Sequence, residues 1–405
     1  MISLNENNKN PSWVDGQIPN FSGVKNLLFP SPISELLGSK IICQNAIIDR
    51  NYNRSKTTEQ LLEQKAPPTP VIQTNIDVLT GERYANSVSS PNQFNSISGY
   101  GLINGADAVA KATGEEIPLL NSPKNQGNNW GQSMIHAPEV WNAGYTGEGV
   151  VVAVLDSGVD YTHPDLINNI WQNTREIPNN GIDDDRNGFV DDVTGWDFVS
   201  QDNTPLDESK HGTHVAGIIA GENNNTGVTG IAYDAKIMPI RILDENGTGS
   251  INNFVKGIHY AVDNGANIIN ISMVTSQPDS QLQDAIEYAE GKGVLVVMAA
   301  GNNGASEPQY PADYAQNIGI AVGSLDFKQQ IVSASNRAGE TPLNYVVAPG
   351  VNIYSTVPNN EYKKLSGTSM ATPFVAGVAA LMLSANHSLT PNRIKEILIR
   401  SAIAL

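Results

Sequence analysis

The chain has 405 residues, 40% of them apolar and 16% charged, which is enough apolar material for one large core. Its formal net charge of −17 would repel nucleic acid and anionic membrane over most of the surface, so we expect neither as a partner. No stretch approaches the roughly 20 consecutive apolar residues that a membrane-spanning helix needs. The acidity suits a protein that collects Ca2+, although it could also serve only to keep the chain soluble.

The first thirty residues have neither a basic leader nor a continuous apolar run, so they do not resemble a secretory signal. We therefore expect a cytoplasmic protein, with export by another route as the alternative, and a monomer. The lone cysteine, Cys43, cannot form an internal disulfide. It agrees with a reducing compartment without establishing one.

Residues 1–120 are rich in Asn, Ser, Gln and Pro and have weak periodicity. We expect a partly irregular N-terminal extension or prosegment, with extended linkers at residues 30–34 and 66–73. Two pieces have the residues of helices: TTEQLLEQK at 57–65, and GADAVAKATG at 105–114, which ends on a glycine.

From Gly149 onward, short β-branched runs alternate with amphipathic stretches, the pattern of a parallel sheet covered by helices on both faces. We expect one three-layer α/β domain of about 280 residues, at 121–405. Its strands are expected at 150–156, 235–243, 266–272, 294–301, 317–324 and 344–350, and its helices at 213–221, 253–265, 282–293, 372–386 and 391–402.

In open parallel sheets, functional groups gather beyond the carboxyl ends of the strands. The run VVVAVLDSG places Asp156 at the end of an apolar strand, where a buried carboxylate needs a partner such as an imidazole. The motif HGTHVAG places His211 at the mouth of a helix and His214 one turn further in. A lone histidine is as often structural as functional; we interpret the outermost, His211, as catalytic and His214 as structural.

An acidic loop, NNGIDDDRNGFVDDVTGWDF, lies between these two motifs at 179–198. Oxygen-bearing side chains at every second position followed by a glycine resemble the start of an EF-hand loop, but Thr194 stands where the closing glutamate belongs. We take Asp191 or Asp192 as the closing ligand; the alternative is a merely solvated acidic loop. The candidate Ca2+ ligands are Asp183, Asp185, Asn187, Phe189, Asp191 and Asp192.

Two more motifs follow further along the chain. AAGNNG at 299–304 presents Asn302, whose neutral NH2 group can stabilise developing negative charge; the alternative is a simple Asn–Gly turn. SGTSMATP at 366–373 places Ser369 at a helix start, with Pro373 expected in the first turn. A serine there can be nucleophile and oxyanion donor together, or only an N-cap. Four such motifs together favour a catalytic site.

The four motifs VAVLDSGVD, HGTHVAG, AAGNNG and GTSMATP resemble the signature blocks of the subtilase family, over about residues 125–401. Over most of its length the chain also resembles the calcium-dependent proteases of cyanobacteria. The resemblance implies a subtilisin-like fold and a serine endopeptidase acting on proteins or peptides. Ser369 would be the nucleophile, His211 the general base, Asp156 its orienting partner, and Asn302 an oxyanion donor.

A second Ca2+ site is implied by the resemblance alone, in the loop GENNNTGVTG at 221–230. The implied ligands are the side chains of Asp165, Asn224 and Gln126, with main-chain oxygens of Glu222, Thr226 and Val228. The family also implies a substrate-binding edge at 270–275, including Ser272 and Met273. Val274 stands where most relatives have glycine and Gln309 where they keep a small residue, so we expect a restricted or altered primary specificity. For Phe374, which replaces the usual histidine, we expect only a packing role.

The chain stops at Leu405 without the closing Gly-rich segment and helix of the family, yet a similar phrase, SGYGLINGADAVAKA, appears at 98–112. This phrase either docks where the closing segment would lie or belongs to a prosegment. We expect an active Ca2+-dependent enzyme that cleaves itself near residues 115–126. The alternative is a catalytically poor family member used as a calcium-stabilised binding or processing module; an unrelated calcium-binding structural protein would not explain the catalytic motifs.

Overall fold

The computed structural model describes residues 40–42, 75–76, 83–84, 93–119 and 128–405. The described residues all belong to one unit, Gly38–Leu405. The expected linkers at 30–34 and 66–73, the expected helix at 57–65 and the candidate ligand Gln126 lie outside the described residues.

A seven-stranded parallel sheet with the order β11-β10-β9-β8-β4-β6-β5 forms the centre of the described domain. Its strands are β4 (Val151–Asp156), β5 (Trp196–Asp197), β6 (Lys236–Arg241), β8 (Ile268–Ile271), β9 (Leu295–Ala299), β10 (Ile320–Leu325) and β11 (Tyr345–Pro349). The strands have nearly continuous apolar, buried runs because the sheet is covered on both faces. The α/β fold expected from the sequence is confirmed.

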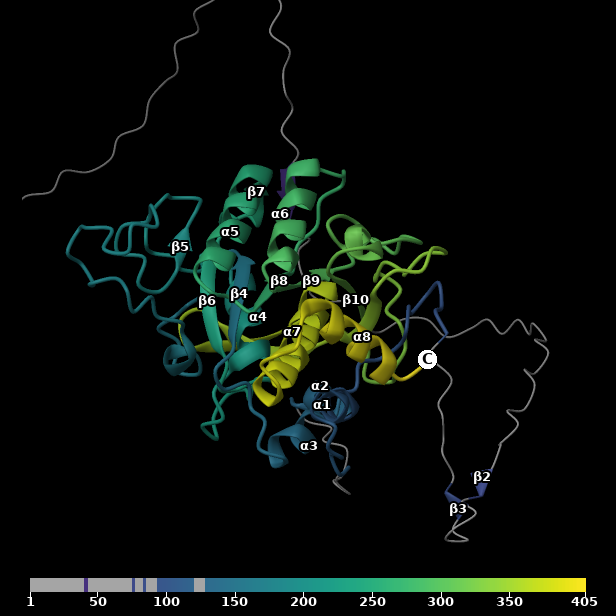
Figure 1. Cartoon of the computed structure of the whole chain (residues 1–405). Helices are drawn as coiled ribbons and strands as arrows, with labels where there is room; N and C mark the ends of the chain where they lie inside the picture. The colour runs from purple at the N-terminus through teal and green to yellow at the C-terminus, as the bar shows by residue number, and fades with distance from the viewer. Residues whose placement is uncertain (1–39, 43–74, 77–82, 85–92, 120–127) are drawn as a thin grey trace, which may run out of the picture. The chain divides into compact units, whose positions relative to one another are not determined.

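Helices cover the sheet in two groups. α5 (Ile251–Asp263) and α6 (Ser280–Gly291) contact each other and strands β4, β6 and β9. α4 (His211–Ala220) and α7 (Thr368–Ala385) contact each other and the sheet, and α8 (Pro391–Ser401) and α1 (Gly105–Thr113) pack against α7. Figure 1 shows α5 and α6 side by side, with α7, α8 and α1 gathered below them.

Helix α7 is apolar around its whole circumference because it runs through the core. Among the described helices it is the one with the length and hydropathy of a membrane span, but 89% of that window is buried inside the domain. A fully buried core helix has the same composition as a membrane helix. The burial therefore assigns α7 to the core.

Local sequence signals account for the helix ends. Asp279 caps α6 by accepting from Gln281 N and Leu282 N, and Thr390 caps α8 by accepting from Arg393 N. Gly114 ends α1 with a left-handed φ of 80°, which confirms the glycine stop expected for the helix at 105–114.

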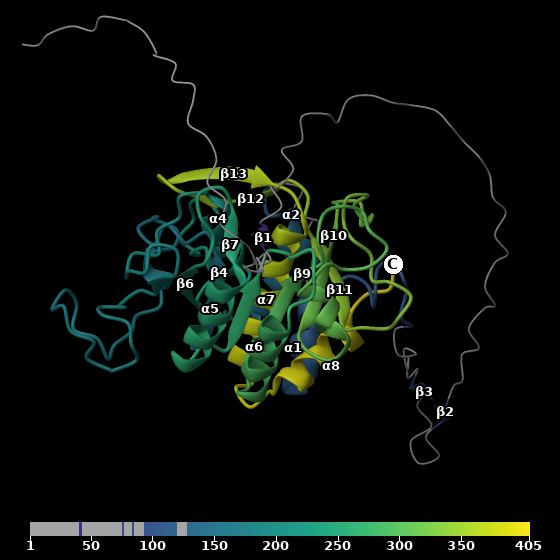
Figure 2. The ribbon, with the colours of Figure 1, turned by 90° about the horizontal axis from the view of Figure 1, so that it is seen from above.

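Several short elements escaped prediction. Strands β12 (Ile353–Val357) and β13 (Glu361–Leu365) form an antiparallel hairpin that packs on α4 and is clearly visible in Figure 2. β1 (Lys40–Ile42) pairs antiparallel with β7 (Thr248–Ser250), and β2 (Asn75–Ile76) with β3 (Arg83–Tyr84). The remaining elements are the helices α2 (Trp130–Met134) and α3 (Ala137–Asn142) and the 3-10 turns η1 (Ile167–Asn169) and η2 (Ala312–Gln316).

Residues 93–119, the longest described part of the N-terminal extension, join the core. Leu102 forms one parallel bridge with Val347 of β11 and one antiparallel bridge with Ile403 near the chain end. The phrase at 98–112 therefore lies between β11 and the C-terminal residues, a position open both to a docked segment and to a prosegment that folds against the enzyme.

Candidate active site

Asp156 and His211 meet at the carboxyl end of the sheet. Asp156 is the last residue of β4, is fully buried, and accepts from His211 Nδ1 at 2.8 Å on Oδ1 and 2.9 Å on Oδ2. A carboxylate on Nδ1 fixes the ring and leaves Nε2 as the nitrogen that can take a proton from a nucleophile. The pair expected from the two motifs is thus confirmed.

The start of helix α4 is fixed by a residue that the sequence analysis missed, Asp207. Its carboxylate is buried, which raises its pKa, and it is surrounded by hydrogen-bond donors. The donors are Ser157 Oγ, Ser209 N, Lys210 N, Thr213 N and Thr213 Oγ1. Because Ser157 directly follows Asp156, this network ties the loop of the catalytic carboxylate to the helix that carries His211. The sequence did contain a signal for Asp207, because it is an acidic residue four positions before His211 and close to a helix start.

Ser369 lies beside the same strand ends. β4 and β8 pair with Leu155 opposite Ile271, so Ser272 follows β8 as Asp156 ends β4. Ser369 Oγ donates to Ser272 O at 2.9 Å, and Ser272 Oγ donates to Ser369 O at 2.9 Å. Two reciprocal bonds thus hold the nucleophile next to the strand that neighbours Asp156.

Pro373 lies inside α7 and not in its first turn, so its expected position was wrong. A proline at this point has no N–H for the carbonyl four residues earlier, which is that of Ser369. Ser272 Oγ replaces the missing donor at 2.9 Å. Pro373 therefore frees the carbonyl of the nucleophile for a contact with strand β8.

Asn302 is oriented by the start of α7. Its Oδ1 accepts from Thr368 N at 2.8 Å and from Thr368 Oγ1 at 3.1 Å. Because the carbonyl end of the amide is bound to Thr368, the NH2 end is the part that can donate to a substrate. A β carbon on Gly367 would lie 3.3 Å from Asn302 Nδ2, so a glycine at this position keeps the approach to the amide open.

His214 is structural, as expected. It is fully buried, and its Nε2 donates to the carbonyls of Ile353 and Lys363, both at 3.0 Å, which joins α4 to the β12–β13 hairpin. Burial, with a smaller effect from nearby His211, lowers the pKa of His214 to about 3. The ring therefore stays neutral in the folded protein well below pH 6.

Acidification should destabilise the protein through His214. In the unfolded chain the ring takes a proton below its ordinary pKa of 6.5, whereas the folded ring does so only near 3, so stability falls as pH decreases between these values. The shift corresponds to roughly 5 kcal/mol. Thermal melts at pH 7 and pH 4 should show a smaller drop in Tm for His214→Gln than for wild type. The exposed control His387→Gln should keep the wild-type drop, and equal drops in all three proteins would contradict this assignment.

The residues expected to bind substrate lie together but are largely covered. Ser272, Met273 and Val274 are 0%, 1% and 5% exposed. Thr275 N donates to Tyr310 O at 2.7 Å, and a β carbon on Gly301 would lie 2.6 Å from Gln309 Oε1. The Gln309 side chain thus occupies the space beside the strand end that leads to Asn302.

Phe374 has the packing role expected of it. Its ring is 1% exposed, and a β carbon on Gly131 of α2 would lie 2.5 Å from Phe374 Cζ. The contact therefore joins α7 to α2.

The acidic loop gathers three carboxylates, one of which the sequence analysis missed. Glu176, Asp183 and Asp185 each offer an oxygen within 4.8 Å of the others, and Arg175 is 3.0 Å from Asp185. Within the part of the chain described, this is the one group of its kind. Three carboxylates facing one another fit a hard divalent cation such as Ca2+.

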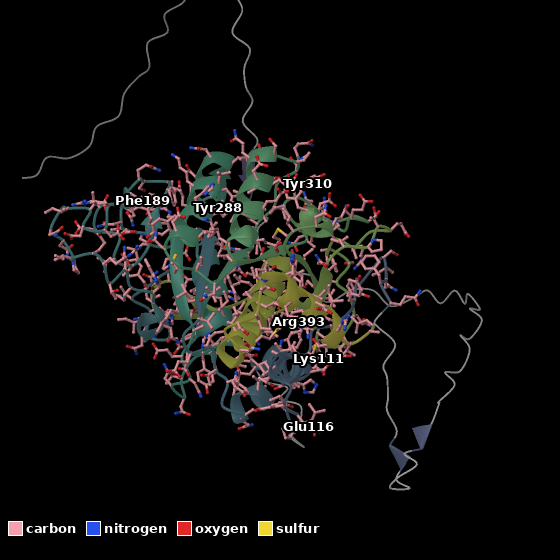
Figure 3. The ribbon with its side chains drawn as sticks, in the orientation of Figure 1. Lys111, Glu116, Phe189, Tyr288, Tyr310 and Arg393 are labelled. Carbon is pink, nitrogen blue, oxygen red and sulfur yellow. The ribbon has the colours of Figure 1, made fainter. Side chains whose placement is uncertain are left out.

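The expected closing ligands face elsewhere. Asp191 accepts from Asn180 N and Gly181 N, and Asp192 is fully buried and accepts from Tyr260 at 2.6 Å. Asn187 points its amide at Asp185 and Asp192, and Phe189 packs among Trp196, Phe198 and Tyr260. Figure 3 shows Phe189 on the side of the domain that carries this loop. The carboxylate that lies with Asp183 and Asp185 is thus that of Glu176, seven residues before Asp183.

The second expected Ca2+ site has a different arrangement. Asp165 is fully buried and accepts from Asn224 Nδ2 at 2.8 Å, Val228 N at 2.9 Å and Tyr362 OH at 2.9 Å. The oxygen of Asn224 instead accepts from Thr226, and Glu222 binds Asn168. Donors face this carboxylate in the present arrangement, as they also face Glu176 and Asp183 in the first cluster, and the Asp165 site stays a prediction.

An Asp–His pair at the carboxyl edge of a parallel sheet, with a helix-start serine held at the neighbouring strand end, is the arrangement found in serine hydrolases. A model of the subtilase family, peptidase S8, matches residues 147–404. The chain therefore belongs to the subtilase family of serine proteases.

Known relatives agree with this assignment. Thermitase from Thermoactinomyces vulgaris is 41% identical over 269 residues, which cover 66% of this chain and 86% of thermitase. A thermophilic serine proteinase from Bacillus sp. (strain AK1) is 42% identical over 265 residues, 65% of this chain but only 59% of that protein. The crystal structure of a cold adapted subtilisin-like serine proteinase superimposes with a TM-score of 0.51 and 32% identity, over 62% of this chain and 81% of that one. These relatives support the family in general and not the narrower resemblance to cyanobacterial proteases.

Proposed function

We propose that the chain is an active serine endopeptidase that hydrolyses peptide bonds in proteins. The observation that carries the proposal is the 2.8 Å bond from His211 to Asp156, with Ser369 held through Ser272 at the neighbouring strand end. Buried Asp156 orients the imidazole and stabilises its cation. These groups supply a nucleophile, a base and the orientation of that base.

In the reaction, Ser369 Oγ turns from Ser272 O toward His211 Nε2 and attacks the scissile carbonyl as the ring takes its proton. The oxyanion accepts from Ser369 N and Asn302 Nδ2. His211 then passes the proton to the leaving amine, and water releases the acyl group by the same route. The Ser369 N–H lies in the first turn of α7, where backbone N–H groups have no partner within the helix.

A fluorophosphonate probe tests the proposal directly. It should label Ser369 in the folded protein and abolish hydrolysis of casein, and Ser369→Ala should take up none. A folded protein that neither labels nor digests casein would favour the alternative, a catalytically poor binding or processing module.

The proposed specificity is restricted at the residue before the cut. The family resemblance implies a glycine where Val274 stands at the substrate edge, and the amide of Gln309 occupies the space beside Gly301. A shallower and more polar pocket should accept small or polar side chains. Cleavage of a peptide library should show this preference, and Gln309→Gly with Val274→Gly should broaden it. A broad preference of the wild-type enzyme for large aromatic and aliphatic residues would refute the proposal.

The proposal includes Ca2+ at Glu176, Asp183 and Asp185, in line with the resemblance to calcium-dependent proteases of cyanobacteria. Binding at 100 times Kd would stabilise the fold by about 2.7 kcal/mol. Chelation should therefore lower Tm by about 5–10 °C and speed autolysis.

The variant Glu176→Gln tests whether the effect of Ca2+ on Tm arises at this cluster or at another site. The variant should lose more than half of the Ca2+-dependent rise in Tm, whereas Glu148→Gln, at an exposed position outside the loop, should keep it. The Asp165 site remains a prediction; if it carries the calcium effect, Glu176→Gln will leave the rise intact and Asp165→Asn will abolish it.

Location and assembly are also part of the proposal: a cytoplasmic monomer acting on protein or peptide substrates. Cell fractionation and size-exclusion chromatography test these two points. Recovery from the culture medium would favour export by another route.

A further inference from the structure

We infer that residues 93–117, here called the edge segment, are a permanent part of the peptidase and not a removable prosegment. The segment binds a surface formed by β11, α7, α8 and the last residues of the chain. It precedes the span that matches the subtilase family, residues 147–404, yet it completes the same core.

The backbone of the edge segment pairs with β11, the edge strand of the central sheet, around one parallel bridge between Leu102 and Val347. Tyr100 N donates to Tyr345 O at 2.9 Å, Val347 N to Gly101 O at 2.9 Å, and Ile103 N to Val347 O at 3.1 Å. This alternation is a parallel ladder on the open side of β11. Without the segment, β11 would be an uncovered edge strand with unpaired backbone groups.

The other side of the edge segment binds the chain end. Leu102 N donates to Ile403 O at 2.9 Å, and Ile403 N donates to Leu102 O at 2.7 Å. The segment therefore lies between β11 and the residues that follow α8. It is enclosed on both sides by the domain, which a prosegment that departs during maturation would not be.

Two glycines fit the segment to this place. Gly99 has a φ of 60°, and a β carbon there would lie 2.6 Å from Tyr345 Cδ1. Gly101 has a φ of 106°, and a β carbon there would overlap the carbonyl of Ile403. Both the left-handed conformation and the close approach require glycine. The sequence is thus adapted to these contacts in detail.

The helix of the edge segment, α1, contributes a fully buried apolar face. It packs against α3, α7 and α8, and Asn386 Nδ2 after α7 donates to Ala112 O at 2.9 Å. Figure 3 shows Lys111 of α1 and Arg393 of α8 in the same region of the domain, as expected from the contact between the two helices. The buried residues of the segment are Leu102, Ile103, Ala106, Ala108, Val109, Ala112 and Ile117, all at most 7% exposed.

The order of these elements in space therefore differs from their order along the chain. In space the edge segment lies between β11 and the C-terminal residues, whereas in the sequence it precedes β4. Cleavage near residues 115–126, where self-processing is expected, would cut the link to the segment without releasing it. A product cut there would consist of two chains held together by the contacts described above.

The first test uses the full chain with Ser369→Ala, which cannot process itself, so its outcome is independent of the proposed activity. Trypsin is added under native conditions, and the surviving core is isolated by size exclusion and identified by mass spectrometry. Residues 93–117 should remain, either within the main chain or as a co-eluting fragment. A core that lacks them and keeps the Tm of the full chain would overturn the inference.

The second test compares two glycine variants in the mature enzyme. Gly101→Ala meets the carbonyl of Ile403, whereas Gly114→Ala has a similar positive φ but no atom within 4 Å of the added carbon. Gly101→Ala should lower the Tm of the mature enzyme by about 5–10 °C more than Gly114→Ala does. A removed prosegment would leave both mature proteins with the same Tm, which would contradict the inference.

A milder variant covers the case in which Gly101→Ala does not fold. Val109→Ala removes a buried side chain of α1 and should lower the Tm of the mature enzyme by several degrees. Ile97→Ala, at a position that is 50% exposed, should not. Equal Tm values for these two mature proteins would count against a permanent edge segment.

Discussion

Alanine in place of Ser369 should lower kcat by about a millionfold, the magnitude known for subtilisin, a member of the same family. Oγ is the atom that attacks the substrate, and no other hydroxyl is held in its place: the neighbouring Ser272 is fully buried and uses its Oγ to bind Ser369 O. His211→Ala should have a similar effect because nucleophile and base act as a unit. The double variant should be no slower than either single one.

The measurement is kcat and KM on a soluble peptide, with Tm as a check on folding. Ser388→Ala and His387→Ala are matched controls at exposed positions and should retain wild-type rates. Retention of 1% of wild-type kcat by a folded, freshly purified Ser369→Ala protein would show that the nucleophile has been misassigned.

Six of the seven strands of the central sheet and the catalytic pair could be predicted because their signals are local, whereas the two-residue strand β5 was missed. The run from Val150 to Asp156 is apolar and ends in a carboxylate, and parallel strands bring their carboxyl ends to one edge. We interpreted His211 and not His214 as catalytic because His211 lies nearer the helix start, and the contacts of the two rings explain why this criterion succeeded. His211, at the helix start, contacts Asp156, whereas His214, one turn later, binds the β12–β13 hairpin.

Residues whose role depends on distant contacts were not predictable in this way. Glu176 lies outside the every-second pattern of the acidic loop, so only the folding of that loop shows it beside Asp183. Asp207 resembles any acidic residue before a helix until five donors are seen around it. Strand β13 (Glu361–Leu365) is mostly exposed and charged, so it lacks the apolar pattern of a strand.

The position of the N-terminal extension was not predictable for the same reason, because it depends on contacts with residues far away in the sequence. Its composition indicates an irregular region, and within the described part only α1 has a helical pattern with a clear glycine stop. Leu102 pairs with Val347, 245 residues later, and with Ile403, 301 residues later, and contacts of this kind leave no periodic signal.

Asn302→Ala should lower kcat by about 100- to 1000-fold with little change in KM. Removal of the corresponding oxyanion-binding asparagine of subtilisin causes a loss of this size. The Nδ2 donor meets full negative charge only once the tetrahedral intermediate forms, so its removal affects the transition state more than substrate binding. The measurement is steady-state kinetics on an ester and an amide substrate.

A structural contribution must be separated from this effect, because Asn302 also accepts from Thr368 N and Oγ1 at the start of α7. Thr368→Val removes the Oγ1 contact but keeps the backbone N–H and the Asn302 amide, so its kcat should stay within about tenfold of wild type. Asn303→Ala, at the exposed neighbouring position, should have no effect. If Thr368→Val costs as much as Asn302→Ala, then Asn302 acts by positioning α7 and the oxyanion depends on Ser369 N alone.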